Sequence, residues 1–160
     1  LDLHQRAFTT AGRATTHDAV FPGFTTMAHQ PDVMQIEAGM GAAAAVMEML
    51  LHTAAGVLRV FPAVPRHWQE VAFADVRAEG AFLVSAERRG GKTRWVRVLS
   101  TQGSALHMAN PIGEACRLER RRTSDRVEEL LEGDVFTLFT TPGEELFFTP
   151  ELLACKETTP

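Results

Sequence analysis

The sequence predicts an α+β protein that is mainly β, with a helix followed by an antiparallel β-sandwich. Residues 40–54 are rich in Ala, Met, Leu and Glu, which are good helix formers. After residue 57 apolar and polar residues alternate, the pattern of strands with one buried face. Turn signals recur about every ten residues along this part, a spacing typical of six to eight short strands in a sandwich.

The helix predicted over residues 40–54 ends before Gly56, a residue that commonly stops a helix. Its apolar face is wide and comprises Ala43, Val46, Met47, Leu50 and Leu51. Because almost no charged side remains for water, we expect a core helix that packs against other helices. The composition changes near residue 57, which predicts one domain over 1–56 and a second over 57–160.

The first predicted strands lie between residues 57 and 100. A short strand over 57–65 is ended by prolines, and alternating runs occupy 81–88 and 92–100. The Gly-Gly pair between these two runs predicts a two-residue hairpin. In the second run, alternation places Trp95 on the face opposite Val96.

Further short runs complete the sandwich. They cover residues 104–110, 115–120, 134–141 and 144–150. The sequence "TPGE" at 141–144 fits a type II turn with proline followed by glycine. Residues 126–132 fit a helix, a strand or a turn equally well.

Composition excludes some classes of protein. The 160 residues are 45% hydrophobic and 22% charged, and a net charge of -4 argues against nucleic acid as a partner. No apolar stretch is long enough to predict a membrane span, and no signal peptide is evident. The chain begins with Leu1 rather than methionine, so we expect a fragment or a processed product. Extracellular, periplasmic and cytoplasmic locations all stay open.

Metal and cofactor chemistry has no sequence support. Six histidines lack metal-binding spacing, and neither a GxSxG motif nor a phosphate-binding glycine loop occurs. The two cysteines, Cys116 and Cys155, form no CxxC pair. We expect two free buried thiols, with a disulfide as the alternative, and we predict neither a metal nor a cofactor.

Glu37 is the candidate catalytic residue. It precedes Gly39, Gly41 and the long apolar run of "QIEAGMGAAAAVMEMLL", residues 35–51. One interpretation is structural, because backbone N–H groups and the helix dipole favour an acid at a helix start. The other is functional: the same groups keep a general base ionised, while the glycines leave room for a substrate ring.

A family resemblance extends over about residues 15–110. The segment "DVMQIEAGMGAAAAVMEMLLHTAAGVLRVFPAVPRHW", residues 32–68, resembles the end of the catalytic domain in the α-L-fucosidase-type glycoside hydrolases of family 95. The loop "HDAVFPGF" at 17–24 is also similar to that family, as is the stretch from Val76 to Pro111, where a strand bearing Gly80 precedes an alternating strand and a hairpin. The resemblance implies terminal helices of an (α/α)6 barrel followed by a C-terminal antiparallel β-sandwich.

The resemblance also implies roles for particular residues. Glu37 would stand on the base side of an inverting glycoside hydrolysis, His17 and Asp18 would line the sugar site, and Trp68 would dock the sandwich onto the barrel. Glutamate replaces the family's aspartate at 37, and Ala-Gly replaces its Gly-Asn at the next two positions, so a different substrate and a degenerate site are both open. The general acid would lie in the N-terminal remainder of the enzyme, so this chain alone should be inactive towards its carbohydrate substrate.

A non-catalytic module is the alternative function. A β-sandwich can bind carbohydrate through aromatic side chains on an exposed sheet face, or it can cap a larger protein. Trp95 is the single plausible stacking residue, and the chain contains no tyrosine.

Overall fold

The computed structural model describes residues 36–151, and their side chains from residue 39 onward. The chain divides into two compact units, Leu1–Glu48 and Met49–Pro160, each described by itself. The first contains most of the helix α2 (Ile36–Leu50). The strands all belong to the second: β1 (Leu51–Ala54), β2 (Val57–Val60), β3 (Val71–Ala78), β4 (Phe82–Arg89), β5 (Lys92–Ser100), β6 (Ala105–Ala109), β7 (Cys116–Arg121), β8 (Arg126–Leu131), β9 (Val135–Phe139) and β10 (Glu145–Pro150).

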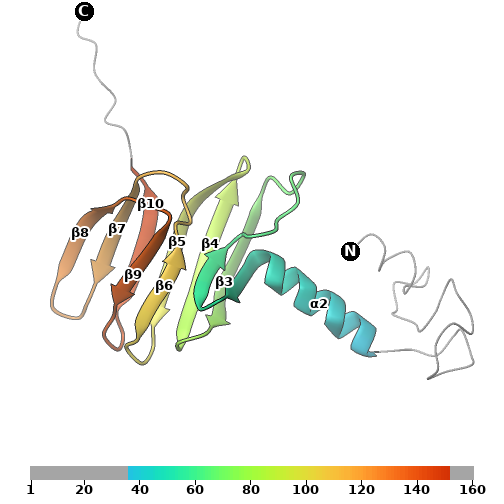
Figure 1. The fold of residues 1–160 in the computed structure, drawn as a ribbon, viewed down its shortest axis with the longest axis horizontal. Coiled ribbons are helices and arrows are strands. Elements are labelled where there is room, and N and C mark those ends of the chain that lie inside the picture. The colour runs from blue at the N-terminus through green and yellow to red at the C-terminus, as the bar shows by residue number, and fades with distance from the viewer. Residues whose placement is uncertain (1–35, 152–160) are drawn as a thin grey trace, which may run out of the picture. The chain divides into compact units, whose positions relative to one another are not determined.

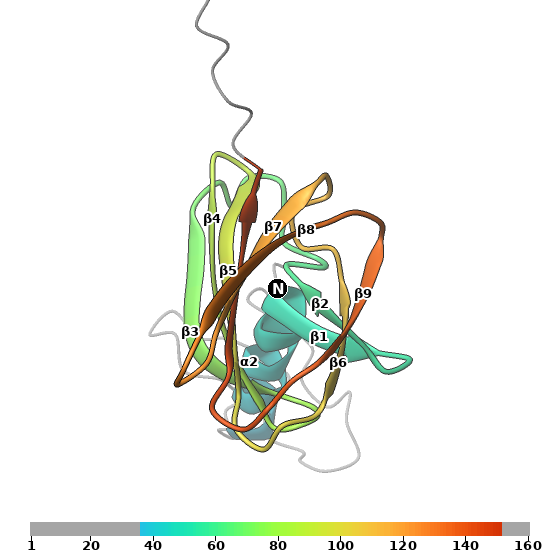
Figure 2. The ribbon, with the colours of Figure 1, turned by 90° about the vertical axis from the view of Figure 1, so that its left-hand side faces the viewer.

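These strands form two sheets, with orders β1-β2-β6-β9 and β3-β4-β5-β10-β7-β8 (Figure 1). Figure 2 shows them as two layers, with β3, β4 and β5 in one and β2, β6 and β9 in the other. The predicted mainly β fold is confirmed. The sandwich is not wholly antiparallel, since β2 and β6 pair in parallel through Leu58 and Met108. Between these two strands the chain builds β3, β4 and β5 in the other sheet, and it returns in the same direction.

Apolar side chains from both sheets fill the space between the layers. The alternating residues of β4 and β5 point inward as predicted, and Val84, Ala86, Val96 and Val98 are completely buried. The rings of Phe136 on β9 and Phe148 on β10 stack 6.4 Å apart and nearly parallel, which joins the two sheets directly. Burial of these side chains is the main stabilising contribution to the sandwich.

Both turns predicted from glycine positions are confirmed. Gly90 and Gly91 have φ values of 56° and 72°, as a two-residue hairpin with primed geometry requires, and Arg89 pairs with Lys92 across it. At the second turn, Gly143 has a φ of 79°, and the Glu144 N–H donates to the Thr141 carbonyl at 3.1 Å. Glycine adopts these left-handed conformations without the steric cost that a side chain adds.

The predicted helix end at residue 54 is wrong, since α2 ends at Leu50 and residues 51–54 form β1. Four residue pairs join β1 to β2, and Gly56 lies in the tight turn between them instead of following a helix. Leu51 is buried in the sandwich core, and this contact with distant residues overrides the local helix propensity. The strands therefore begin at Leu51, before the boundary predicted after residue 56.

The prediction that this helix is buried is not met by the residues that the structure describes. Met40 and Met47 are 67% and 42% exposed, and of the α2 side chains described only Leu50 is buried. No second helix occurs within residues 39–151. The (α/α)6 barrel that would cover α2 stays a prediction.

Besides β1, two further strands were not predicted as such. β3 escapes the alternation pattern because a bulge shifts its register between Phe73 and Val76, where Asp75 has a φ of 51°. Gly80, expected on a strand, lies in the turn that follows β3. The ambiguous segment 126–132 contains β8, so at least ten strands are present against the six to eight expected.

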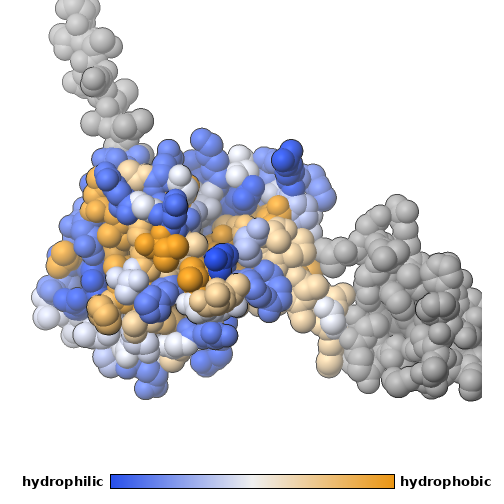
Figure 3. Space-filling view, in the orientation of Figure 1, coloured by the Kyte–Doolittle hydropathy of each residue, from blue (hydrophilic) through white to orange (hydrophobic). Residues whose placement is uncertain are grey.

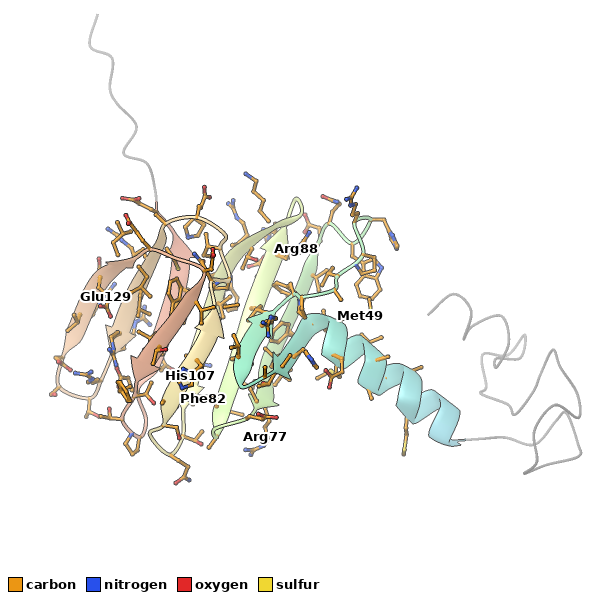
Figure 4. All side chains as sticks on the ribbon, viewed as in Figure 1. Met49, Arg77, Phe82, Arg88, His107 and Glu129 are labelled. Carbon is orange, nitrogen blue, oxygen red and sulfur yellow. The ribbon has the colours of Figure 1, made fainter. Side chains whose placement is uncertain are left out.

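The outer face of the four-stranded sheet is partly apolar. Figure 3 shows apolar side chains in the middle of the face on which β6 and β9 lie. Phe139 and Val135 of β9 are 75% and 53% exposed. Next to them His107, labelled in Figure 4, forms a hydrogen bond with the Thr137 hydroxyl at 3.1 Å. This face offers contact area for packing and few charged groups.

Candidate ligand-binding site on the six-stranded sheet

The outer face of the six-stranded sheet carries charged side chains together with aromatic ones. The strand registers align its side chains in rows: Glu87 of β4 lies beside Trp95 of β5, and Phe147 of β10 lies beside Glu119 of β7. Trp95 lies on this face, opposite the buried Val96, as alternation predicts. A half-buried tryptophan on an outward sheet face is the feature that a stacking site requires.

The Trp95 side chain is held on both sides. Its indole Nε1–H donates to Glu87 Oε2 at 2.7 Å. Its ring stacks on Phe147, with centroids 5.8 Å apart and planes inclined by 17°. The Arg121 guanidinium lies over the other ring of this pair, 5.8 Å from the Phe147 centroid. The indole is therefore fixed before any ligand arrives.

Beside this ring is a hollow of about 530 Å³, called here the Trp95 hollow. Its lining residues are Glu87, Arg89, Arg94, Trp95, Arg117, Thr149 and Pro150. The volume is within the roughly 300–1,000 Å³ of small-ligand sites. Three arginines and one glutamate give the lining an excess of positive charge.

A bulge in β5 places Arg94 in the lining. Glu87 pairs with Trp95 and Arg88 pairs with Thr93, so Arg94 has no partner on β4. In a regular strand, neighbouring residues point to opposite faces. The bulge instead allows Arg94 and Trp95 to line the same hollow, which is a common use of bulges at functional sites.

Glu87 is the acid of the hollow and is already engaged. The hydrogen bond from Trp95 lowers the pKa of Glu87, partial burial opposes this, and the hydrogen bond and charge of Arg89 and the charge of Arg94 lower it further. Glu87 is therefore ionised at neutral pH, and its two oxygens accept from Trp95 and Arg89. The remaining cations of the lining are Arg94 and Arg117.

Arg97, on the same face, is held by ion pairs. Arg97 Nε donates to Glu145 Oε1 at 3.0 Å, and its Nη1 lies 3.2 Å from Asp75 Oδ1. Arg117, by contrast, is 57% exposed and its closest carboxylate is Glu128, at 3.7 Å. No ion pair of Arg94 occurs between residues 39 and 151. Within the Trp95 hollow, Arg94 and Arg117 are thus less neutralised than Arg89, which pairs with Glu87.

A second polar cluster is enclosed and has a structural role. Glu144 is 1% exposed, and its Oε1 accepts from Arg120 Nε at 2.7 Å and lies 3.2 Å from Arg122 Nε. Its Oε2 accepts from the Thr141 N–H and hydroxyl at 2.9 and 3.1 Å. Burial alone would raise the pKa of Glu144, but these hydrogen bonds outweigh it and lower the pKa to about 2. The cluster ties the turn before β10 to β7.

The structure describes only some of the residues predicted from the family resemblance. The backbone of Glu37 is in the first turn of α2, while its side chain, His17 and Asp18 lie outside the described residues. Trp68 is half-buried and contacts His67 edge-on, with ring centroids 6.4 Å apart.

Sequence reasoning found Trp95 but missed the charged groups around it. Arg117 and Thr149 come from β7 and β10, and only strand pairing brings them near β5. The Gly-Gly hairpin was the one local signal, since it anchors the strand end that carries Arg94.

The described residues limit other kinds of site. No three of their His, Cys, Asp and Glu side chains are grouped so as to hold a metal ion. Within the same part of the chain, no helix has the length and apolar character needed to cross a membrane. Cys116 is a free and buried thiol, as expected, and Cys155 lies outside the described range. No protein-family model matches the chain, and no relative is found among curated proteins.

Proposed function

We propose that this chain is the C-terminal part of a glycoside hydrolase, comprising the last inner helix of its catalytic domain and a β-sandwich. The observation that carries the proposal is the position of Glu37 in the first turn of a helix that leads directly into the sandwich. This order of elements agrees with the resemblance to the α-L-fucosidase-type hydrolases. The chain acts with the N-terminal remainder of the same enzyme, on a carbohydrate substrate.

In this proposal Glu37 is the general base of an inverting hydrolysis. An inverting enzyme uses one carboxylate to take a proton from water as the water attacks the anomeric carbon, while a second carboxyl group protonates the leaving oxygen. The first turn of a helix presents backbone N–H groups and a positive dipole end, which keep a carboxylate ionised. The second carboxyl group is supplied by the remainder of the enzyme, so the chain alone does not hydrolyse glycosides.

Two features of α2 support this placement. A Cβ added at Gly41 meets no atom within 4 Å among the described residues, so the backbone there is open to a close approach. The exposed Met40 and Met47 also fit a helix whose apolar sides pack on further helices of a catalytic domain.

The test is Glu37→Gln in the full-length protein that contains this chain, with Glu48→Gln on the same helix as control. Aryl glycosides, including an α-L-fucoside, serve as probes, and NMR identifies the anomer released. We expect inversion, a loss of at least about 100-fold in kcat for Glu37→Gln, and an unchanged Tm. Equal rates for Glu37→Gln and the unaltered protein would contradict the proposal, as would failure of the full-length protein to cleave any probe.

A second candidate function is carbohydrate binding by the sandwich without catalysis. The observation that favours it is the fixed indole of Trp95 beside a hollow of about 530 Å³. The apolar C–H face of a sugar ring can stack on an indole, while polar groups at the rim bind its hydroxyls. This function needs only the chain itself, so it is tested by saccharide binding to the isolated chain.

A further inference from the structure

We propose that the Trp95 hollow binds an acidic saccharide, with a sugar ring stacked on Trp95 and its anionic group held by Arg94 and Arg117. The inference rests on the second candidate function and names the class of ligand for that site. The anionic group is a carboxylate of a uronic acid or a sulfate ester. Both present oxygens in the geometry that a guanidinium binds through two parallel N–H bonds.

The charge of the lining favours an anion. The lining has four charged residues. Glu87 accepts hydrogen bonds from Trp95 and Arg89, so its negative charge and the positive charge of Arg89 already neutralise each other. Arg94 has no ion pair among the described residues, and Arg117 has only the exposed Glu128, at 3.7 Å; both line the same hollow. A neutral sugar would leave the Arg94 guanidinium to water and Arg117 to its exposed pair with Glu128, whereas an acidic sugar would supply both arginines with an anionic partner.

A second hollow extends the site past the β4–β5 hairpin. It has a volume of about 500 Å³ and shares Arg94 and Pro150 with the Trp95 hollow. Its lining adds two cations, Arg88 and Lys92, against one carboxylate, Glu114. The Arg88 Nε is buried without an acceptor in the described part of the chain. The site therefore suits an oligosaccharide with more than one acidic residue.

The opposite side of the Trp95 hollow limits the length of a polyanion. Beyond Arg117 a third hollow of about 250 Å³ is lined by Glu128, Glu129 and Glu151. A long phosphate backbone crossing the sheet in this direction would meet these carboxylates, and the chain as a whole has a net charge of -4. The distribution of charge favours a short acidic saccharide over nucleic acid.

The experiment is calorimetric titration of the chain with four probes at matched ionic strength: a tetragalacturonate, a sulfated tetrasaccharide, maltotetraose and a single-stranded oligonucleotide. The fluorescence of Trp95, measured in a Trp68→Phe background, reports whether a probe reaches the hollow, because these are the two tryptophans of the chain. We expect one or both acidic saccharides to bind at least about tenfold more tightly than maltotetraose. The stronger of the two identifies the anionic group, and binding should weaken in high salt.

Arg94→Gln and Arg117→Gln should each weaken acidic-saccharide binding about tenfold or more, with no change in Tm. Trp95→Ala should abolish binding, but it also removes the stacking contact with Phe147 and could therefore lower stability. The two arginine variants test the site without removing that contact. The control is Arg77→Gln: Arg77 is exposed on β3, and Figure 4 shows it at the opposite end of the sheet from Arg88. The affinity of the Arg77→Gln variant for the acidic saccharides should be unchanged.

The outcomes distinguish failure of this inference from failure of the carbohydrate-binding function on which it rests. Equal affinity for maltotetraose would overturn the acidic class while leaving carbohydrate binding in place. Tighter binding of the oligonucleotide, or binding of no saccharide, would overturn both. Neither result bears on the glycoside hydrolase proposal, which is decided by the Glu37 variant in the full-length protein.

Discussion

The buried carboxylate of Glu144 makes a strong prediction about stability. Glu144 has a pKa of about 2 in the folded protein against an ordinary value of 4.5. Each pKa unit is worth about 1.4 kcal/mol, so the ionised carboxylate contributes about 3 kcal/mol to the free energy of unfolding at neutral pH. We expect Glu144→Gln to lose about this amount, because it removes the negative charge that pairs with Arg120, whose side chain is 15% exposed.

The sign of the pH dependence follows from the lowered pKa. The contribution is fully present above the unfolded-state pKa of about 4.5 and is lost as the pH falls towards about 2, when Glu144 becomes protonated in the folded state as well. The stability difference between the unaltered chain and Glu144→Gln should therefore be about 3 kcal/mol at pH 7 and should shrink steadily below pH 4.5. Taking the difference cancels carboxylates common to both proteins.

Urea unfolding followed by circular dichroism at pH 7, 4 and 3 measures this difference, and at pH 7 the Tm of Glu144→Gln should be lower by about 10 °C. The control is Glu128→Gln, since Glu128 is 44% exposed and its arginine partners are 3.5 and 3.7 Å away. An exposed pair of this kind contributes at most about 1 kcal/mol. The reasoning would be refuted by a loss below about 0.5 kcal/mol for Glu144→Gln, or by a loss that does not change with pH.

Two further predictions concern a glycine and a thiol. Gly103→Ala should lower the free energy of unfolding by more than about 2 kcal/mol, because φ is +72° and the new Cβ would lie 2.7 Å from Pro142 Cδ. Gly113→Ala is the control: φ is +83° but no atom lies within 4 Å, so the loss should be only about 1 kcal/mol. Equal losses for the two variants on urea unfolding would contradict the predicted clash with Pro142. In a Cys155→Ser variant, Cys116 should react with Ellman's reagent at pH 8 only after unfolding, because burial raises its pKa to about 11. Rapid reaction of the folded chain would contradict this.

Several elements of the fold follow from local sequence alone. Alternation along β4 and β5 predicts which side chains form the core, because a strand with one buried face needs a period of two. The glycines at 90, 91 and 143 predict their turns, because each needs a backbone conformation that other residues adopt only at a cost. These are short-range effects, and neighbouring residues suffice to specify them.

Elements that depend on distant partners could not be predicted in this way. Residues 51–54 have helical neighbours and a helical composition, yet they form a strand because Leu51 is buried in the core and β2 supplies the backbone partners. β3 was missed because its bulge at Asp75 breaks the alternation. In both places tertiary contacts outweigh a local preference of a few tenths of a kcal/mol per residue.

The candidate site shows the same division. The sequence by itself determined that Trp95 lies on the face opposite Val96, and the structure shows that this face points outward. Only the tertiary structure decided what surrounds it: the bulge in β5 brings Arg94 to the same side, and strand pairing brings Arg117 from β7 across β10. The physical reason is that a strand's period is a local property, whereas a charged hollow is built by hydrogen-bonded partners far apart in the chain.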